Sequence, residues 1–585
     1  MSEAPAASGT ESGDAAVSIV SRPLPAPLPP LGDDLPPLLR RVYAARGVTA
    51  PAELDRSLRA LLPPDELTDA DRAAERLARA VMAREPILVV GDFDADGATA
   101  VALSVSLLGA LGAEAVDFLV PNRFEFGYGL SPEIVELAVP RAPRVLVTVD
   151  NGVSSVAGVA AANAAGIDVI VTDHHLPGAT LPDAYALVNP NRADCAFASK
   201  ALAGVGVIYY VLGRVRTRLR EAGWFDARPE PNLADWLDLV ALGTVADVVP
   251  LDANNRVLVH QGLARMRAGR CRPGIRALAD VAGRRLAALS AQDLGFALGP
   301  RLNAAGRLED MTLGIRCLLA ATDAEARERA RALDELNRTR RALERDMVRD
   351  AELLVAGHPV EAGDRFGVCV YEPGWHQGIV GIVAGRLREK IHRPVVAFAE
   401  AGPAAPDELK GSARSLPDLH VRDALDAIAA RYPGLLMRFG GHAMAAGLSI
   451  KRVHYDRFAR AFDAEVARRL PAEALTRTLV TDGTLAGEDM NLATARALAA
   501  GGPWGQGFPE PLFHGEFEVV NQRVVGEDHL KLVLRHDGRV VDAIAFRQPP
   551  LGDVARLRAA YRLNEYDYGQ TSTLQLVVEH IEPVA

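Results

Sequence analysis

Short apolar runs alternate with alanine-rich stretches between about residues 85 and 175. The runs are ILVV (87–90), VDFLV (116–120), RVLVTV (144–149) and DVIVT (168–172). Each run is followed by a turn containing Gly or Asp and then by a segment with helical spacing. The strands of a parallel sheet that is covered on both faces read as continuous apolar runs. The alternation therefore predicts βαβ units and a parallel sheet with helices on both sides.

The rest of the chain shows three further patterns of hydrophobic and polar residues. Helical patterns dominate from about 200 to 355, and the charged segment 323–355 predicts a long connector helix. A second α/β unit begins near residue 366 and ends near 470. Five strand-like runs then lie between 515 and 582, and they predict a small barrel of the OB type. The expected fold is α/β, with a parallel-sheet domain joined by the long helix to a second α/β domain and followed by an OB-like β-barrel.

At 585 residues the chain is too long for a single hydrophobic core. Residues 1–34 are rich in Ala, Ser, Pro and Gly, which predicts a disordered tail. The boundaries expected after this tail are 35–270 for the parallel-sheet domain, 271–355 for a helical linker with the connector helix, 356–470 for the second α/β domain and 471–585 for the barrel.

The composition is that of a soluble globular protein, with 49% hydrophobic and 24% charged residues. No apolar run reaches the ~18 residues that span a bilayer, and the pattern of a secretory signal is missing. The four cysteines are widely scattered, which argues against a zinc site or a disulfide scaffold. We therefore expect a cytoplasmic protein with no membrane association.

The formal net charge of −10 does not by itself favour a nucleic-acid partner. A carboxylate-rich metal site would contribute to this acidic total, so the location of the basic residues is more informative than their number. Charge therefore leaves a nucleic-acid substrate open.

Acidic and histidine clusters fall where the predicted strands end. GDFDADG (91–97), VDNG (149–152) and TDHH (172–175) each follow an apolar run. Ligands of open parallel sheets bind beyond the carboxyl ends of the strands, so these clusters are expected to converge. A fourth motif, GTVADVV (243–249), places a carboxylate in an apolar stretch, where burial is costly without a partner or a metal. The candidate residues are Asp92, Asp94, Asp96, Asp150, Asp173, His174, His175 and Asp247.

The residue types select the metal. Carboxylates with one or two imidazoles and no thiolate suit Mn²⁺ or Mg²⁺ better than zinc. Clustered carboxylates repel one another unless cations lie between them. Two divalent ions about 3.5–4 Å apart would relieve that repulsion, activate water and stabilise the leaving oxygen in phosphoryl hydrolysis. Each motif alone is often only a turn or a chance surface pair, but four such motifs in order predict a metal site.

These four motifs resemble the successive motifs of the DHH phosphoesterase superfamily. Further stretches narrow the resemblance to the RecJ-type single-strand-specific 5′→3′ exonucleases, over roughly residues 35–585. They are PNRFEFGYGLS (121–131), VNPN (188–191), GPRLNAAGR (299–307), GWHQGIVGIVAGR (374–386), GSARS (411–415), FGGHAMAAG (439–447) and GFPEPLF (507–513). One departure is Phe126, where a polar or acidic residue is expected, and it leaves the contact made by that loop open.

The resemblance implies two divalent metal ions, with Mn²⁺ preferred and Mg²⁺ possible as an alternative. Asp94 and Asp150, with Asp92 as a further candidate, would bind one ion. Asp96, Asp150, His174 and Asp247 would bind the other, so that Asp150 bridges the pair. The catalytic residues would be His175, facing the scissile phosphate, together with Asp150 and His174. Asp173 would orient a histidine, and the candidate phosphate contacts are Arg123, Arg301, Arg307, Ser412, Arg414 and His442.

The resemblance also implies the substrate and the partners. The chain would act as a monomer on single-stranded DNA and release 5′ mononucleotides in DNA repair and recombination. A helicase and a single-stranded-DNA-binding protein are candidate partners, and the barrel would hold the strand. One alternative is a DHH phosphodiesterase acting on short oligonucleotides or cyclic dinucleotides, which the extra barrel disfavours. Another is a non-catalytic replication scaffold, which the intact set of candidate ligands disfavours.

Overall fold

The computed structural model describes residues 17–122, 125–357, 365–403, 405–526, 528–568 and 571–584. The chain divides into two compact units. The larger unit is discontinuous and consists of Ser21–Asn337 and Thr481–Ala585. The smaller unit consists of Arg338–Val480 with the N-terminal segment up to Val20. Each unit is described by itself.

A five-stranded parallel sheet organises the larger unit, with strand order β3-β2-β4-β5-β6. The four apolar runs form strands as predicted, and β6 is a further strand of three residues. The strands are β2 (Ile87–Val90), β3 (Val116–Leu119), β4 (Val145–Val149), β5 (Asp168–Thr172) and β6 (Ala186–Val188).

Helices cover both faces of this sheet, as the sequence predicted. Alternate residues of β2 point in opposite directions: Val89 packs in the cluster that contains α2, α3 and α6, whereas Leu88 packs in the cluster that contains α4 and α5. Helix α3 is buried on most sides, which explains its nearly continuous apolar sequence. The bounds are α2 (Ala70–Ala83), α3 (Ala95–Leu111), α4 (Pro132–Ala138), α5 (Val156–Ala164) and α6 (Gly204–Glu221).

A helical segment follows the sheet. It includes a π-helical turn, η7 (Leu294–Leu298), directly before α11. The predicted connector helix is present as α13, which has 34 residues. The bounds are α7 (Leu237–Ala246), α8 (Ala253–Arg267), α9 (Pro273–Val281), α10 (Ala291–Asp293), α11 (Gly299–Leu308), α12 (Thr312–Leu318) and α13 (Asp323–Ala356).

The smaller unit is the second α/β fold, and its sheet is mixed. The strand order is β10-β11-β9-β8-β7, and only β7 and β8 pair in parallel. Phe398, Phe458 and Phe462 are fully buried in its core. The elements are β7 (Val368–Tyr371), α14 (Val380–Ile391), β8 (Val395–Glu400), β9 (Glu408–Arg414), α15 (Val421–Arg431), β10 (Arg438–Gly441), β11 (Ala445–Lys451) and α16 (Tyr455–Arg469).

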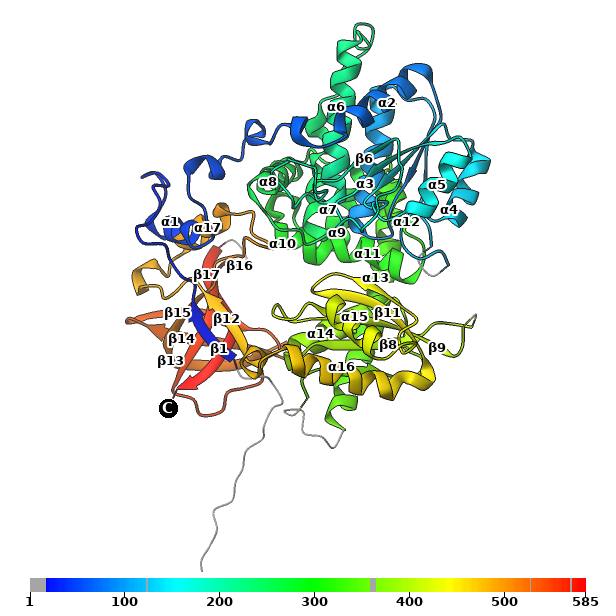
Figure 1. Cartoon of the computed structure of the whole chain (residues 1–585). Helices are drawn as coiled ribbons and strands as arrows, with labels where there is room; N and C mark the ends of the chain where they lie inside the picture. The colour runs from blue at the N-terminus through cyan, green and yellow to red at the C-terminus, as the bar shows by residue number, and fades with distance from the viewer. Residues whose placement is uncertain are drawn as a thin grey trace, which may run out of the picture. The chain divides into compact units, whose positions relative to one another are not determined.

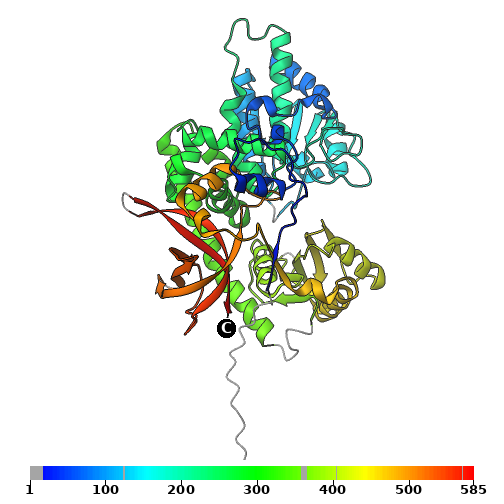
Figure 2. The same cartoon turned by 90° about the vertical axis from the view of Figure 1, so that its left-hand side faces the viewer.

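The last five strands form a closed barrel in the order β13-β14-β15-β17-β16, which confirms the predicted OB-like β-barrel (Figure 2, orange to red). The barrel closes through the parallel pair β15–β17 and the antiparallel pair β13–β16. Its strands are β13 (Phe513–Val525), β14 (His529–His536), β15 (Arg539–Ala545), β16 (Arg556–Tyr568) and β17 (Thr571–Val584).

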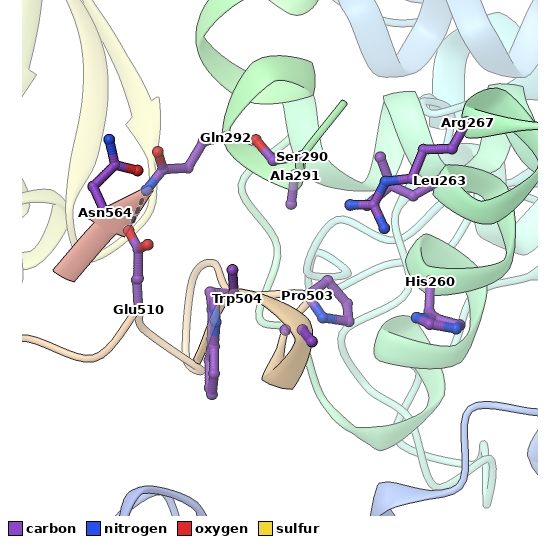
Figure 3. A pocket seen from close by; sticks show the side chains of 13 residues that line it. His260, Leu263, Arg267, Ser290, Ala291, Gln292, Pro503, Trp504, Glu510 and Asn564 are labelled. Atoms are coloured by element: carbon purple, nitrogen blue, oxygen red, sulfur yellow. Dashed lines mark hydrogen bonds between the residues drawn. The ribbon is translucent and has the colours of Figure 1, made fainter. Parts of the chain in front are cut away.

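The barrel shares one hydrophobic cluster with the rest of the larger unit. Helix α1 (Pro37–Ala44) lies beside α17 (Leu492–Gly501) in Figures 1 and 2. Tyr43 of α1 stacks on Phe508, and Phe508 stacks on Trp504 with a centroid distance of 5.1 Å. Nearby, a cavity of about 210 Å³ lies between α8 and the segment after α17, and Trp504 forms part of its wall (Figure 3).

The N-terminal prediction needs one correction. Residues 1–16 of the expected disordered tail lie outside the described residues, but Val17–Ser21 forms strand β1 and pairs with β12 (Arg477–Thr481). The segment VSIVS has the β-branched residues that favour strands, and pairing satisfies its backbone groups. Among the helices of the described ranges, none combines the length and the apolar character needed to cross a bilayer.

Candidate metal centre

The acidic and histidine clusters of the sequence meet at the carboxyl end of the parallel sheet. They follow β2, β4 and β5, and Asp247 joins them from the end of α7. Three overlapping groups place one possible ligand atom per residue within 4.8 Å of one another. The groups are Asp92, Asp94 and Asp150; Asp96, His174 and Asp247; and Asp150, His174 and His175.

The N-terminal ends of two helices position Asp94 and Asp96. Asp94 is the N-cap of α3 and accepts a hydrogen bond from the Gly97 N–H at 3.0 Å. Asp96 accepts hydrogen bonds from the N–H groups of Gly204 and Val205, at 2.6 and 3.0 Å, at the start of α6. A Cβ atom on Gly204 would lie 2.5 Å from the Cβ of Asp150. Glycine therefore allows α6 to approach the cluster this closely.

The ring of His174 lies between two carboxylates. Its Nε2 is 3.1 Å from Asp150 Oδ1 and 3.4 Å from Asp247 Oδ2. Both oxygens are buried and accept no hydrogen bond from the described residues. Buried polar atoms normally have a partner, and oxygens converging with an imidazole nitrogen suit a divalent cation. The residues therefore fit a metal site on the evidence of their own geometry.

Burial and mutual repulsion shift the acidity of this cluster. Burial raises the pKa values of Asp96 and Asp150 well above the ordinary value, and neighbouring carboxylates raise them further. The pKa of Asp247 rises to about 7 for the same reasons, with burial as the largest cause. Bound cations would reverse these shifts, because a nearby positive charge favours the ionised carboxylate.

Asp173 fixes the second histidine. Its carboxylate accepts hydrogen bonds from the backbone N–H groups of His174, His175 and Val153, and its Oδ1 is 2.8 Å from His175 Nδ1. Burial opposes ionisation of Asp173, but the hydrogen bond from His175 lowers its pKa. Burial likewise opposes protonation of His175, yet the bond to Asp173 and nearby carboxylates raise the His175 pKa to about 9. The contact with Asp173 therefore fixes the orientation of the His175 ring.

Three further residues support the histidine pair, a role that the sequence did not predict for them. The amide of Asn189 donates to the His175 carbonyl at 2.8 Å, and that of Asn191 donates to the His174 carbonyl at 2.6 Å. Both belong to the VNPN stretch at the end of β6, and this motif is the feature of the sequence that could have identified them. The hydroxyl of Tyr128 lies 3.0 Å from His175 Nδ1. Phe126, the departure noted in the sequence, packs against the apolar cluster beside α4.

The three arginines predicted as phosphate contacts in the larger unit lie in different surroundings. Arg123 lies outside the described residues. Arg301 is only 7% exposed and forms a buried ion pair with Asp334 of α13 at 2.8 Å. Its Nη1 also donates to the Ala297 carbonyl. In this structure the donors of Arg301 hold α11 against α13, and its role as a phosphate contact stays a prediction. Arg307 lies half-buried in the last turn of α11.

The smaller unit contains a guanidinium without an acidic counterpart. Arg414, at the end of β9, donates from Nη1 to Ser412 Oγ at 2.9 Å. No carboxylate of the described residues offsets its charge: burial lowers the Arg414 pKa, and the nearby cation Arg388 lowers it further. A Cβ atom on Gly381, in the first turn of α14, would lie 2.8 Å from Arg414 Nη2. His442 is exposed on the turn between β10 and β11.

The domains identify the class of protein. Residues 86–244 match the DHH family, N-terminal domain, residues 363–468 match the DHHA1 domain and residues 481–580 match the RecJ OB domain. The parallel sheet and the carboxylates and histidines that follow its strands lie in the first of these, and Asp247 follows it by three residues. The chain is thus a DHH-superfamily protein with an additional OB barrel.

Full-length relatives narrow the class to one family. The chain is 51% identical over 562 residues to the single-stranded-DNA-specific exonuclease RecJ of Salmonella typhimurium, covering 94% of this chain and 96% of that protein. RecJ of Escherichia coli is also 51% identical, over 563 residues and the same shares of the two chains. The crystal structure of RecJ with Mn²⁺ from Thermus thermophilus matches with a TM-score of 0.80 and 32% identity, covering 97% of this chain and 80% of that one. The chain belongs to the RecJ family of single-stranded-DNA-specific exonucleases.

Proposed function

We propose that the chain is an exonuclease that hydrolyses single-stranded DNA from the 5′ end and releases 5′ mononucleotides, using two divalent metal ions. The convergence of Asp92, Asp94, Asp96, Asp150, His174 and Asp247 is the observation that carries the proposal. Asp150 belongs to two of the three groups, and His174 belongs to two as well. A pair of ions sharing Asp150 accounts for this overlap.

Each residue then has a distinct role. Asp92, Asp94 and Asp150 would hold one ion, whereas Asp96, His174 and Asp247, together with Asp150, would hold the other. When bound, the two ions supply a nucleophilic water and stabilise the charge of the leaving oxygen. His175 would donate a hydrogen bond from its ring to an oxygen of the scissile phosphate, and Asp173 keeps the ring in that orientation. Mn²⁺ and Mg²⁺ both suit the oxygen-rich ligands, and the Thermus relative has been crystallised with each. We propose Mn²⁺ as the preferred ion.

Arg414 and Ser412 are proposed to bind the 5′-terminal phosphate. The support is the half-buried guanidinium, beside which the described residues place no carboxylate, because an anionic phosphate would supply the missing charge. Arg307 and His442 remain proposed contacts along the DNA strand.

The barrel is proposed to hold the DNA strand further from the cleavage site, as OB folds do. We also propose a cytoplasmic monomer that works with a helicase and a single-stranded-DNA-binding protein in repair and recombination.

A time course on end-labelled strands tests the direction and the metals. We expect a 5′ label to appear first as a mononucleotide, a 3′ label to remain on long fragments until late, and a chelator to stop the reaction. Parallel reactions in Mn²⁺ and in Mg²⁺ measure the metal preference. Early release of the 3′ label, or internal cuts, would contradict the proposal. Cleavage restricted to very short oligonucleotides or cyclic dinucleotides would favour the alternative phosphodiesterase.

The second prediction concerns the 5′ phosphate. A 5′-phosphorylated strand should be degraded faster than one with a 5′ hydroxyl, and Arg414→Ala should remove most of that preference. A lost charge-assisted hydrogen bond of about 1.5–3 kcal/mol corresponds to roughly 10–100-fold in kcat/KM. The measurement is kcat/KM on both strands for both proteins. Arg422→Ala, which removes an exposed arginine of α15, is the matched control and should keep the preference. An unchanged preference in Arg414→Ala would remove Arg414 from the phosphate site.

A further inference from the structure

Helix α11 contacts the loop that carries the proposed metal ligands Asp92, Asp94 and Asp96. Asn303 of α11 accepts a hydrogen bond from the backbone N–H of Ala95 at 2.8 Å. Ala95 is placed between Asp94 and Asp96, and it is the first residue of α3. Asn303 therefore contacts the backbone of the loop rather than the carboxylates.

The Ala95 amide needs this partner. The first N–H groups of a helix have no acceptor within the helix. Asp94 satisfies the Gly97 N–H, so its capping bond goes to a different amide. Ala95 is almost completely buried, at 1% exposure, and solvent is not a ready alternative. Without the Asn303 oxygen, the loop would have to shift to satisfy this amide.

A second contact on the same helix touches the other side of the loop. A Cβ atom on Gly306, one turn after Asn303, would lie 1.9 Å from the carbonyl oxygen of Phe93. Phe93 separates Asp92 from Asp94. Glycine at 306 thus lets the α11 backbone approach the loop, and the two contacts bracket the segment between Asp92 and Asp96.

Helix α11 is itself anchored. Arg301, two residues before Asn303, forms the buried ion pair with Asp334 of α13. Its Nη2 also donates to the Val281 carbonyl at 3.3 Å. These bonds hold α11 in one position, so the Asn303 oxygen is a fixed point against which the loop is located.

We propose that Asn303 is a positioning residue of the metal centre, which holds the loop of Asp92, Asp94 and Asp96 in the shape that binds metal ions. The inference rests on the metal site of the proposed function. An amide also suits this position because an aspartate would add a further negative charge near an already crowded group of carboxylates.

Direct titration of the DNA-free full-length chain with Mn²⁺ by calorimetry tests the inference without a nuclease assay. We expect Asn303→Ala to bind Mn²⁺ roughly 10–100-fold more weakly, the loss typical of groups that orient metal ligands. Activity at saturating Mn²⁺ should recover toward the wild-type kcat, whereas the Mn²⁺ concentration for half-maximal activity should rise. Asn303→Asp keeps an acceptor oxygen in place and should retain Mn²⁺ affinity much better than the alanine variant.

Asn163→Ala is the matched control, because it removes an asparagine that donates to a backbone carbonyl far from the loop in sequence and should leave Mn²⁺ affinity unchanged. Asn303→Gln, which moves the oxygen by one methylene, serves if the alanine variant does not fold, and it too should bind Mn²⁺ more weakly. Wild-type affinity in folded Asn303→Ala or Asn303→Gln would overturn the inference. Failure of the wild-type chain to bind Mn²⁺ would instead overturn the metal site of the proposed function.

Discussion

Asp150→Asn should reduce hydrolysis of single-stranded DNA by at least ~10²–10⁴-fold, the range seen when an essential catalytic group is removed. The carboxylate is 1% exposed and belongs to two of the three ligand groups, so its amide replacement weakens both proposed ion sites at once. An amide also cannot neutralise two cations. The measurement is kcat/KM on a 5′-phosphorylated strand in saturating Mn²⁺.

The same variant should keep its fold. Without metal, Asp150 is a buried carboxylate whose pKa is raised by burial and by the carboxylates around it. Its removal relieves repulsion, so the melting temperature of the metal-free protein should stay level or rise. The Mn²⁺-induced increase in melting temperature should shrink, because ligand binding stabilises only the state that binds. Asp117→Asn, an exposed carboxylate on β3, is the control and should change neither quantity by much. More than about a tenth of wild-type activity would exclude Asp150 as the shared ligand, given the losses expected of essential groups.

Trp504→Ala should strongly destabilise the larger unit. The indole packs against Phe508 and Tyr43, and its Nε1 donates to the Leu498 carbonyl at 2.9 Å. Truncation of a buried tryptophan typically costs about 3–5 kcal/mol. The measurement is thermal or denaturant unfolding of the full chain followed by a probe in the larger unit, because the two units need not unfold together.

Trp224 provides the control for this substitution. It is only half-buried, at the edge of the unit beside Arg228, and Trp224→Ala should lower the unfolding midpoint by less than Trp504→Ala does. Below its unfolding transition, Trp504→Ala should retain the Mn²⁺ affinity of the wild type, because no proposed ligand touches this cluster. Equal midpoints for the two variants would mean that the aromatic stack adds no more stability to the larger unit than Trp224 does.

The sequence was most informative where chemistry and periodicity coincide. Asp92, Asp150 and His174 each follow an apolar run, so the geometry of parallel sheets alone predicted that they meet. The five strand-like runs near the end of the chain predicted the barrel for a similar reason. Strand β6 was missed because three residues are too few to show a period. Strand β1 was missed because it lies within a segment dominated by Pro, Ala and Gly.

Contacts between side chains that are distant in sequence could not be predicted from local sequence patterns. The ion pair of Arg301 with Asp334 could not be predicted, because Asp334 lies 33 positions away on another helix. Asn303 lies within the GPRLNAAGR stretch, but its role could not be predicted, because its partner, the buried Ala95 amide, lies 208 positions away in sequence. Both cases depend on contacts between elements that no local spacing encodes.

The discontinuous course of the larger unit has a consequence for its synthesis. The Tyr43 hydroxyl donates to the Gly501 carbonyl, 458 positions later. At ~5–20 residues per second, a ribosome makes that second partner about 20–90 s after the first. The smaller unit is nearly continuous in sequence, so most of it emerges and can fold within that interval. During the same interval the apolar face of α1 lacks its final neighbours. A nascent chain stalled before Thr481 therefore presents an aggregation-prone surface, and chaperone capture should be strongest at that length.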